Sequence, residues 1–313
     1  MDRIYLSHAM GGSTGRAQYG WKRHGVRAAM AIGIALQARA AGIVSLQNAN
    51  SIGVAGLVPA SVTVSGNSTA NIGLGFNSTT TGQHATETIN TGVTLTGTVF
   101  YDNSDQISNC TRASGGCVTD ASDLGPGGTL VTNAANDFTN AAALTPTQTF
   151  TTINGSTGLG DLGNNNDTNV ISISTINLTS NLTITGTAAD YFILQVAGNV
   201  TLNSHSILLG GTLLASHVLI VLTGASGSTV SVLSGDTLNG SLLSNNAHYT
   251  FTIDGTVNGA VINDAGITLN GAHVVGADAF DGVPEPATWG LMAAGLAGTA
   301  LLRRRSKRAN ASR

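Results

Sequence analysis

Short alternations of apolar and small polar residues fill the chain from Phe150 to Val275. Ile171-Ser172-Ile173 and Leu182-Thr183-Ile184 are two of them. Each alternation places its apolar side chains on one side of an extended segment, which is typical of a half-buried β-strand. Two denser runs, Phe192–Val196 and Val218–Leu222, are apolar on both sides apart from one glutamine. These runs predict strands that are covered on both faces.

A coarse repeat organises these strands. Thr237–Leu243 reads TLNGSLL, and Thr256–Ile262, nineteen residues later, reads TVNGAVI. Phe251–Gly255 reads FTIDG and recurs sixteen residues later as ITLNG. A period of this length, with two or three strands in each repeat, predicts a β-helix in which stacked coils share one core. The Asn-Gly steps are expected to supply positive-φ turns at the coil corners. An antiparallel sandwich is the alternative, but it explains the regular spacing less well.

One segment has a different period. Residues 129–144 carry apolar side chains at helical spacing, with Asn, Asp and Thr between them, and Thr145-Pro146 follows. Proline disfavours a helical conformation in the residue before it, so the helix should end there. The sequence therefore predicts a single helix lying along the side of the coil stack.

The N-terminal region has the order of parts that an export signal requires. Lys22, Arg23 and Arg27 precede the apolar run Ala28–Leu36, and Ala38-Arg39-Ala40 follows as a small-x-small cleavage pattern. The apolar run is too short for a stable membrane span. We therefore assign residues 1–40 to a signal region and expect the folded ectodomain over residues 41–280.

The C-terminal region, residues 283–313, reads as a sorting and anchor segment. Val283, Pro284, Glu285 and Pro286 are followed by the apolar stretch Ala287–Leu302. A basic cluster closes the segment: Arg303, Arg304, Arg305, Lys307 and Arg308. This pattern predicts a C-terminal transmembrane helix whose basic end stays cytoplasmic, with the body outside. An ordinary tail anchor is the plainer alternative.

The order of proline-rich box, apolar stretch and basic cluster resembles the PEP-CTERM sorting signal of Gram-negative bacteria. That resemblance implies processing by an exosortase and association with exopolysaccharide or biofilm. It also implies a location at the cell envelope, on the outer surface or in the extracellular matrix.

The body carries a second resemblance. Residues 140–149, NAAALTPTQT, and the stretch Asp236–Gly271 are similar to segments of ice-binding-like adhesin domains. The same late stretch also resembles choice-of-anchor A domains. Both families imply a right-handed parallel β-helix with one helix alongside, and neither implies catalysis. No Thr-x-Thr ladder in register is evident in this sequence, which counts against ice binding.

Charge excludes one class of partner. Between Ala41 and Gly282 the chain has one lysine or arginine, Arg112, against fourteen acidic residues. An acidic body repels the phosphate backbone, so no nucleic-acid partner is expected.

The two cysteines, Cys110 and Cys117, bracket a six-residue loop. In an exported protein this spacing favours a disulfide, and two free thiols in a loop are the alternative. Two cysteines cannot complete a zinc site by themselves. A weak calcium candidate is formed by Asp161, Asn165 and Asp167, whose oxygens are hard ligands, although Asp and Asn in turns usually bond their own backbone. We therefore predict no cofactor and no metal.

The enzyme classes that use β-helices need features that this body lacks. Lyases of this shape use several basic residues, and glycosidases need clustered carboxylates. Here the acids are scattered singly, with Asp161, Asp167, Asp190 and Asp236 as the nominal candidates for a catalytic acid. Isolated histidines, among them His217, are expected to be solvated.

We therefore predict no catalytic residue and interpret the chain as an exported, envelope-anchored structural or adhesion protein that binds extracellular polysaccharide. A polysaccharide-processing β-helix enzyme is the alternative, and an ice-binding protein is a weaker one.

Overall fold

The computed structural model describes residues 43, 45–48, 50–57, 59–75, 85–102, 106–155, 159–160, 168–224, 227–245 and 247–283. They belong to one unit, Gly42–Val283. The predicted signal region and the predicted transmembrane helix lie outside the described residues. Among the helices that are described, none is long and apolar enough to cross a membrane.

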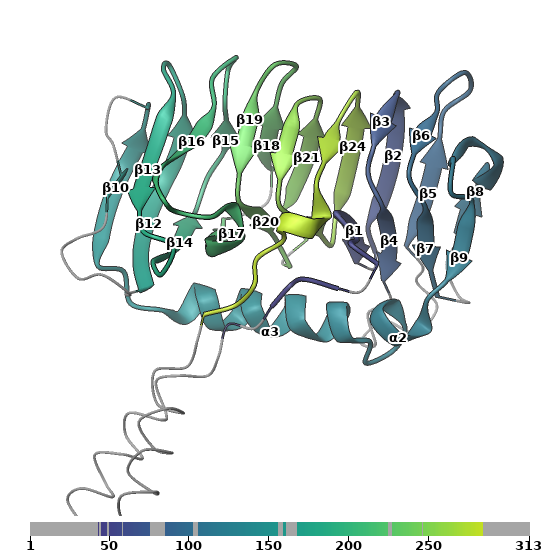
Figure 1. Ribbon diagram of the computed structural model, residues 1–313, viewed down its shortest axis with the longest axis horizontal. Coiled ribbons are helices and arrows are strands. Elements are labelled where there is room, and N and C mark those ends of the chain that lie inside the picture. Colours follow the sequence, from purple (N-terminus) through teal and green to yellow (C-terminus); the bar gives the residue numbers. More distant parts are fainter. Residues whose placement is uncertain are drawn as a thin grey trace, which may run out of the picture. The chain divides into compact units, whose positions relative to one another are not determined.

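The strands wind into coils with three faces, and every strand pairing is parallel (Figure 1). The first face contains, in spatial order, the first part of β12 (Thr168–Asn177), then β14 (Tyr191–Val196), β17 (Val218–Leu222), β20 (Ser241–Leu243), β23 (Val261–Asn263), β1 (Val54–Leu57), β4 (Ile72–Gly75), β7 (Val99–Tyr101) and β9 (Cys117–Thr119). The second face contains the end of β12, then β15 (Val200–Thr201), β18 (Ser228–Val232), β21 (Tyr249–Ile253), β24 (Gly266–Asn270), β2 (Ser61–Gly66), β5 (Thr86–Ile89) and β8 (Gln106–Ser108).

The third face is a separate hydrogen-bonded sheet. It contains β11 (Leu159–Gly160), β13 (Leu182–Gly186), β16 (Ile207–Gly211), β19 (Thr237–Asn239), β22 (Thr256–Asn258), β25 (His273–Val274), β3 (Ser68–Thr69) and β6 (Leu95–Thr96). β10 (Gln148–Ile153) pairs along β12 at the end of the stack.

The order of the coils in space differs from their order in the chain. The first coil, which starts with β1, stacks on the last coil, which starts with β23, in the middle of the molecule. The chain builds outward from this position to β9 at one end. Helix α2 (Ala121–Leu124) and helix α3 (Thr129–Ala143) then lead back along the stack to β10 at the other end (Figure 1). The remaining coils return to the middle.

Apolar side chains fill the inside of the stack. On the first face, each coil contributes one fully buried side chain that lies in register with those of the neighbouring coils. We call this set the inner column: Ile171, Leu194, Ile220, Leu242, Val261, Val54, Ile72 and Val99. No single coil could remove these side chains from water, so each coil depends on its two neighbours.

A second core lies between the first face and the long helix. Leu130, Ala134 and Ala141 of α3 are buried against the outer side of that face. Gln195, the one polar residue of the run Phe192–Val196, donates from Nε2 to the carbonyl oxygens of Ala141 (2.6 Å) and Leu144 (2.9 Å). It therefore adds a second donor to Ala141 O, which also accepts from Leu144 N–H (3.4 Å), and supplies one to Leu144 O beyond the end of the helix.

The structure confirms the mainly β fold of parallel stacked coils and the long helix beside them. The predicted helix at 129–144 is observed at Thr129–Ala143. The two seven-residue repeats pair in register, Thr237 with Thr256 and Leu242 with Val261. Their corner glycines have positive φ, 135° at Gly240 and 152° at Gly259. The short helix α2 was not foreseen.

Val261 provides a test of the inner column because its side chain is fully buried between Leu242 and Val54. We expect Val261→Asp to lower the free energy of unfolding by more than about 3 kcal/mol, because it buries an unpaired carboxylate. Asn270→Asp, at an exposed coil corner, should change it by less than about 0.5 kcal/mol. Urea unfolding followed by circular dichroism measures both, and equal stability of the two variants would contradict the stacking.

Candidate functional site: a hydroxyl face and a terminal clamp

Two columns of small residues, mostly Thr and Ser, run along the outer side of the second face. In the first column, register pairs join Asn177, Thr201, Ser231, Thr252, Thr268, Thr63 and Thr88. In the second column, two residues earlier on each strand, they join Thr229, Thr250, Gly266, Ser61 and Thr86. All these residues are exposed or half-buried, and they alternate with buried inward residues. We call these twelve residues the hydroxyl face.

The spacing of the hydroxyl face follows from strand geometry. Neighbouring strands lie about 4.8 Å apart, and two residues along a strand span about 6.6 Å. Thr229-x-Ser231, Thr250-x-Thr252 and Ser61-x-Thr63 therefore present hydroxyl groups on a regular two-dimensional grid. None of the twelve residues is charged. The surface can therefore form hydrogen bonds over a wide area.

This register bears on an expectation from the sequence. The sequence shows no Thr-x-Thr ladder, and among the described strands of this face only β21 and β5, which are not neighbours, carry Thr-x-Thr. A single column of threonines is nevertheless in register on four neighbouring strands, Thr252, Thr268, Thr63 and Thr88, and two of these strands, β24 and β2, are far apart in the chain.

A second cluster holds the two ends of the described unit together. Leu46 N–H donates to Phe280 O (2.7 Å) and Val283 N–H donates to Ile43 O (2.9 Å). We call the described residues of 43–48 together with residues 279–283 the terminal clamp. Phe280 N–H donates to the hydroxyl oxygen of Ser241 in β20 (2.9 Å), and Asn133 of α3 donates to Ser45 O (2.8 Å). The clamp is therefore fastened to both the first face and the long helix.

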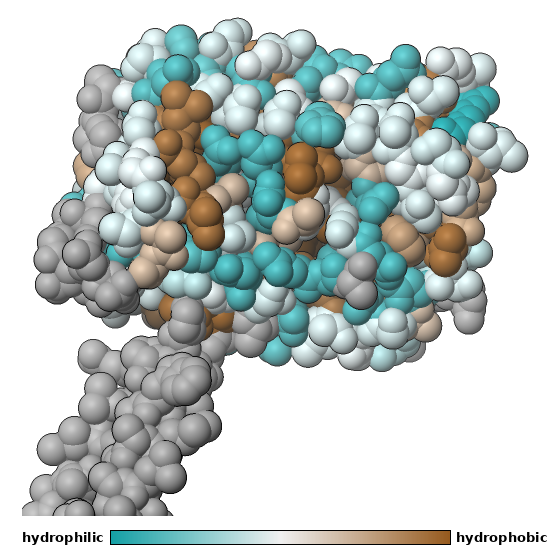
Figure 2. All heavy atoms as spheres, in the orientation of Figure 1, coloured by the Kyte–Doolittle hydropathy of each residue, from teal (hydrophilic) through white to brown (hydrophobic). Residues whose placement is uncertain are grey.

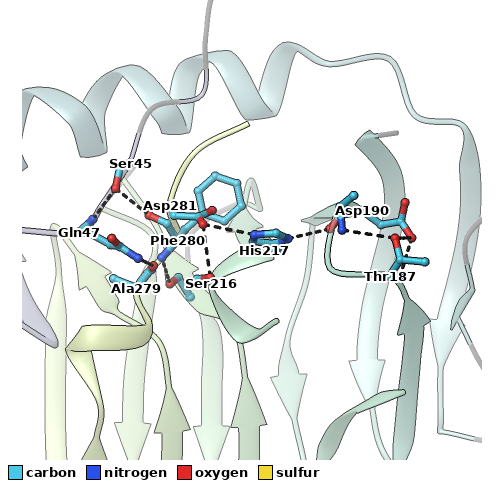
Figure 3. Close-up of polar contacts among 11 residues, drawn as sticks. Ser45, Gln47, Thr187, Asp190, Ser216, His217, Ala279, Phe280 and Asp281 are labelled. Atoms are coloured by element: carbon cyan, nitrogen blue, oxygen red, sulfur yellow. Dashed lines mark hydrogen bonds and ion pairs between the residues drawn. The ribbon is translucent and has the colours of Figure 1, made fainter. Parts of the chain in front are cut away.

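His217 links the clamp to the body (Figure 3). Its Nε2 lies 3.2 Å from an oxygen of Asp281, and its Nδ1 lies 3.1 Å from the carbonyl oxygen of Asp190. The ring also stacks on Tyr191, with centroids 4.1 Å apart. Both polar partners are acceptors when Asp281 is ionised, so the ring satisfies both only when both nitrogens carry protons. Burial raises the pKa of Asp281, and the nearby His217 partly opposes this rise. The expectation that the isolated histidines are solvated was wrong for His217, which is buried.

Several acids that the sequence left as candidates are structural. The carboxylate of Asp190 accepts from Thr187 N–H (2.7 Å), and that of Asp236 accepts from Leu233 N–H (2.7 Å). Seven of the eleven acids that the structure describes in the body are buried: Glu87, Asp102, Asp120, Asp137, Asp190, Asp236 and Asp264. In the described part of the chain no group of three or more His, Cys, Asp or Glu side chains could hold a metal ion. The calcium candidates Asp161, Asn165 and Asp167 lie outside the described residues.

The two cysteines and the arginine between them lie near the end of the stack. Cys110 and Cys117 form a disulfide, with Cα atoms 5.5 Å apart. Arg112, between them, donates from Nη1 to Ile89 O (2.8 Å) and so helps to hold this loop to β5. Of the predicted sorting residues, Val283 belongs to the terminal clamp. Pro284, Glu285, Pro286, Arg303, Arg304 and Arg305 lie outside the described residues.

The C-terminal segment that begins in the clamp matches a family model. Residues 282–305 match the model described as the PEP-CTERM protein-sorting motif. The chain carries a PEP-CTERM sorting motif. This motif implies that the protein is exported, sorted to the bacterial cell surface and processed by an exosortase, which is a membrane enzyme. Its first two residues, Gly282 and Val283, belong to the terminal clamp, so the motif begins within the folded body.

No curated protein sequence matches this chain. Solved structures to which it is similar include an ice-binding protein from an Antarctic biological consortium (17% identity, TM-score 0.49, 74% of this chain and 90% of that one). Others are an ice-binding protein from an Arctic yeast (14%, 0.48, 74% and 94%) and the DUF3494 domain of a Shewanella frigidimarina ice-binding protein (15%, 0.46, 74% and 96%). Similarity at this level transfers no function to the PEP-CTERM protein.

The buried carboxyl of Asp236 gives a pH-dependent test of its structural role. Burial is the largest influence on its pKa and raises it above the ordinary aspartate value. Because the folded pKa lies above the unfolded pKa, the group stabilises the fold most at low pH, and this contribution is lost as pH rises through the folded pKa. Asp236→Asn removes the titration, so the stability of the variant relative to wild type should increase from pH 3 to pH 7. Urea unfolding at several pH values measures the difference, and a constant or falling difference would contradict this assignment.

Proposed function

We propose that the exported body is a non-catalytic binding protein whose hydroxyl face binds ice. The observation that supports this proposal is the register of Thr and Ser side chains across successive coils. A threonine offers both a hydroxyl group, which can bond to water, and a methyl group, which favours a less mobile hydration layer. Held on a rigid grid, such side chains can fix water molecules in an ordered array before contact with a crystal.

The rigidity of the grid matters for this role. Many weak contacts to a solid surface add up to a useful affinity only if they form at the same time. A flexible side chain loses entropy when it is ordered by binding, and this loss reduces the affinity. The inner column and the backbone ladder fix the strands, and branched threonine has few accessible rotamers. The absence of charge from the hydroxyl face also fits, since a charged group would hold its own hydration shell against the ice lattice.

Binding to extracellular polysaccharide is the second candidate. The observation that favours it is the sorting motif, which resembles those of proteins associated with exopolysaccharide. On this proposal the body would act as a structural or adhesion protein in the surface matrix. Several acids of the body bond to backbone groups in turns and do not form the pair of carboxylates that hydrolysis needs. This arrangement favours binding of the polymer over its cleavage.

Thr252 lies near the middle of the hydroxyl face, and its side chain is exposed. We expect Thr252→Tyr to abolish inhibition of ice recrystallisation, because the bulky ring keeps the rest of the grid away from the crystal. Thr185→Tyr, at an exposed position on the third face, should keep full activity. Recrystallisation and thermal hysteresis assays measure both variants, with circular dichroism as the check on folding. Inactive wild-type protein, or equal activity of the two variants, would overturn the ice-binding proposal.

The sorting motif is tested separately. Replacement of Pro284, Glu285 and Pro286 by alanine should prevent recognition by the exosortase and leave a longer, unprocessed form in the membrane fraction. Asn310→Ala with Ser312→Ala, outside the matched residues 282–305, should be processed normally. Cell fractionation with intact-mass measurement distinguishes the forms. Identical mass and distribution for all three proteins would contradict exosortase processing.

A further inference from the structure

A groove of about 420 Å³ opens on the third face, away from the hydroxyl face. Strands β16, β19 and β22 contribute Leu209, Asn239 and Asn258 to its lining. The segment before β17 contributes Leu213–Ser216, and the short helix η3 (Gly276–Asp278) contributes Asp278. In Figure 1 this segment and the yellow turn of η3 cross in front of the strands. The volume is within the range of about 300–1,000 Å³ typical of small-molecule sites.

The polar side of the groove is fixed by a chain of amides. Asn258 donates from Nδ2 to Asn239 Oδ1 (2.7 Å), and Asn239 donates from Nδ2 to Ile207 O (2.7 Å). These bonds determine which way each amide is turned. Among the described residues, none donates to the side-chain oxygen Oδ1 of Asn258, so this atom ends the chain of amides as an acceptor for a ligand hydroxyl group.

The other side of the groove is apolar. Leu213 is nearly buried, whereas Leu214 is 47% exposed and is one of the few large apolar side chains that the described surface leaves open. Figure 2 shows brown, hydrophobic spheres beside teal, hydrophilic ones on the face of the stack that carries η3 in Figure 1. A pyranose ring has the same division, because its axial C–H groups form an apolar side and its hydroxyl groups form a polar rim.

The charge of the groove lining further restricts the class of ligand that can bind. Asp278 is the only charged residue in the lining, and its side chain can accept hydrogen bonds from hydroxyl groups. It would repel the carboxylate of a uronic acid, and among the described residues no cation lines the groove to offset that repulsion. The groove therefore suits an uncharged sugar.

We propose that this groove binds a neutral pyranose unit of a polysaccharide. The inference rests on the second candidate function above and names its ligand class. Hydrolysis is not part of it, because Asp278 is a single carboxylate and the nearest acid in sequence, Asp281, is engaged by His217.

Affinity gel electrophoresis of the full chain in mild detergent tests the proposal. The probes are three neutral polymers, laminarin, dextran and hydroxyethyl cellulose, and one uronic acid polymer, alginate. We expect at least one neutral polymer to retard the protein and alginate to have no effect. Asn258→Ala and Leu214→Ala should each raise the Kd for the neutral polymer about tenfold, the loss expected from one hydrogen bond or one apolar contact.

Leu233→Ala is the matched control, because Leu233 is 39% exposed but lies outside the groove. It should bind like wild type. Asp278→Lys should make alginate retard the protein, since it places a cation where the carboxylate stood. Urea midpoints of all variants check that the fold is kept.

The outcomes distinguish failure of the groove proposal from failure of the polysaccharide-binding role on which it rests. If none of the four polymers retards wild type, both the groove and the polysaccharide-binding role are wrong. If alginate alone retards it, polysaccharide binding stands and the groove proposal is wrong. If a neutral polymer binds but Asn258→Ala and Leu214→Ala bind as tightly as Leu233→Ala, polysaccharide binding stands and the groove is wrong.

Discussion

The stacking of the chain's first coil on its last coil is the contact on which the rest of the structure depends. β1, β2 and β3 pair with β23, β24 and β25, so this one contact joins two half-stacks on all three faces. Without it each half-stack would expose a further open end with inner side chains and strand edges in water. The terminal clamp lies at the same place in the chain's path, because the first coil follows one of its segments and the last coil precedes the other. Continuity of the core thus brings both ends of the described body together, and the sorting motif starts from that point.

The hydroxyl face is a consequence of the same register. In a parallel stack, the inward residue of each strand fixes the strand's register, since a shift by one residue would turn apolar side chains outward. Once Phe251 lies beside Ile267 inside the stack, Thr252 must lie beside Thr268 outside it. The inner column therefore aligns the outer columns with no contact between the hydroxyl groups themselves. A surface made in this way repeats as regularly as the core beneath it.

The sequence could predict the pairing of coils that follow each other in the chain, but not the pairing of coils that are far apart in the chain. The nineteen-residue repeat was visible because Thr237–Leu243 and Thr256–Ile262 follow each other closely and pair directly. The helix was visible from its period alone. The hydroxyl ladder was not, because Thr63 and Thr268 are neighbours in space and about two hundred residues apart in the chain. These strands meet because α3 returns the chain along the stack so that the last coil reaches the first, and no local pattern encodes that path.

Single polar residues misled the sequence reading for a related reason. Gln195 looked like an interruption of a covered strand, yet it satisfies the end of α3. His217 looked like a surface residue, yet it lies between Asp190 and Asp281 and holds the clamp. In both cases the partner comes from a different coil or helix, so only the folded chain shows why the residue is there.

The acids show how far composition can mislead about chemistry. Counted along the sequence, they describe a strongly negative body with no catalytic pair. In the structure, Asp190, Asp236 and Asp264 accept backbone N–H groups at coil corners, where the strands end and no ladder partner is available. A carboxylate is a strong acceptor for such groups, and a chain with many corners needs many acceptors. Much of the acidity therefore serves the turns, and the surfaces left to recognise a ligand, the hydroxyl face and the groove beside Asn258, are nearly uncharged. Recognition by this body would then depend on hydrogen bonds and shape rather than on its net charge.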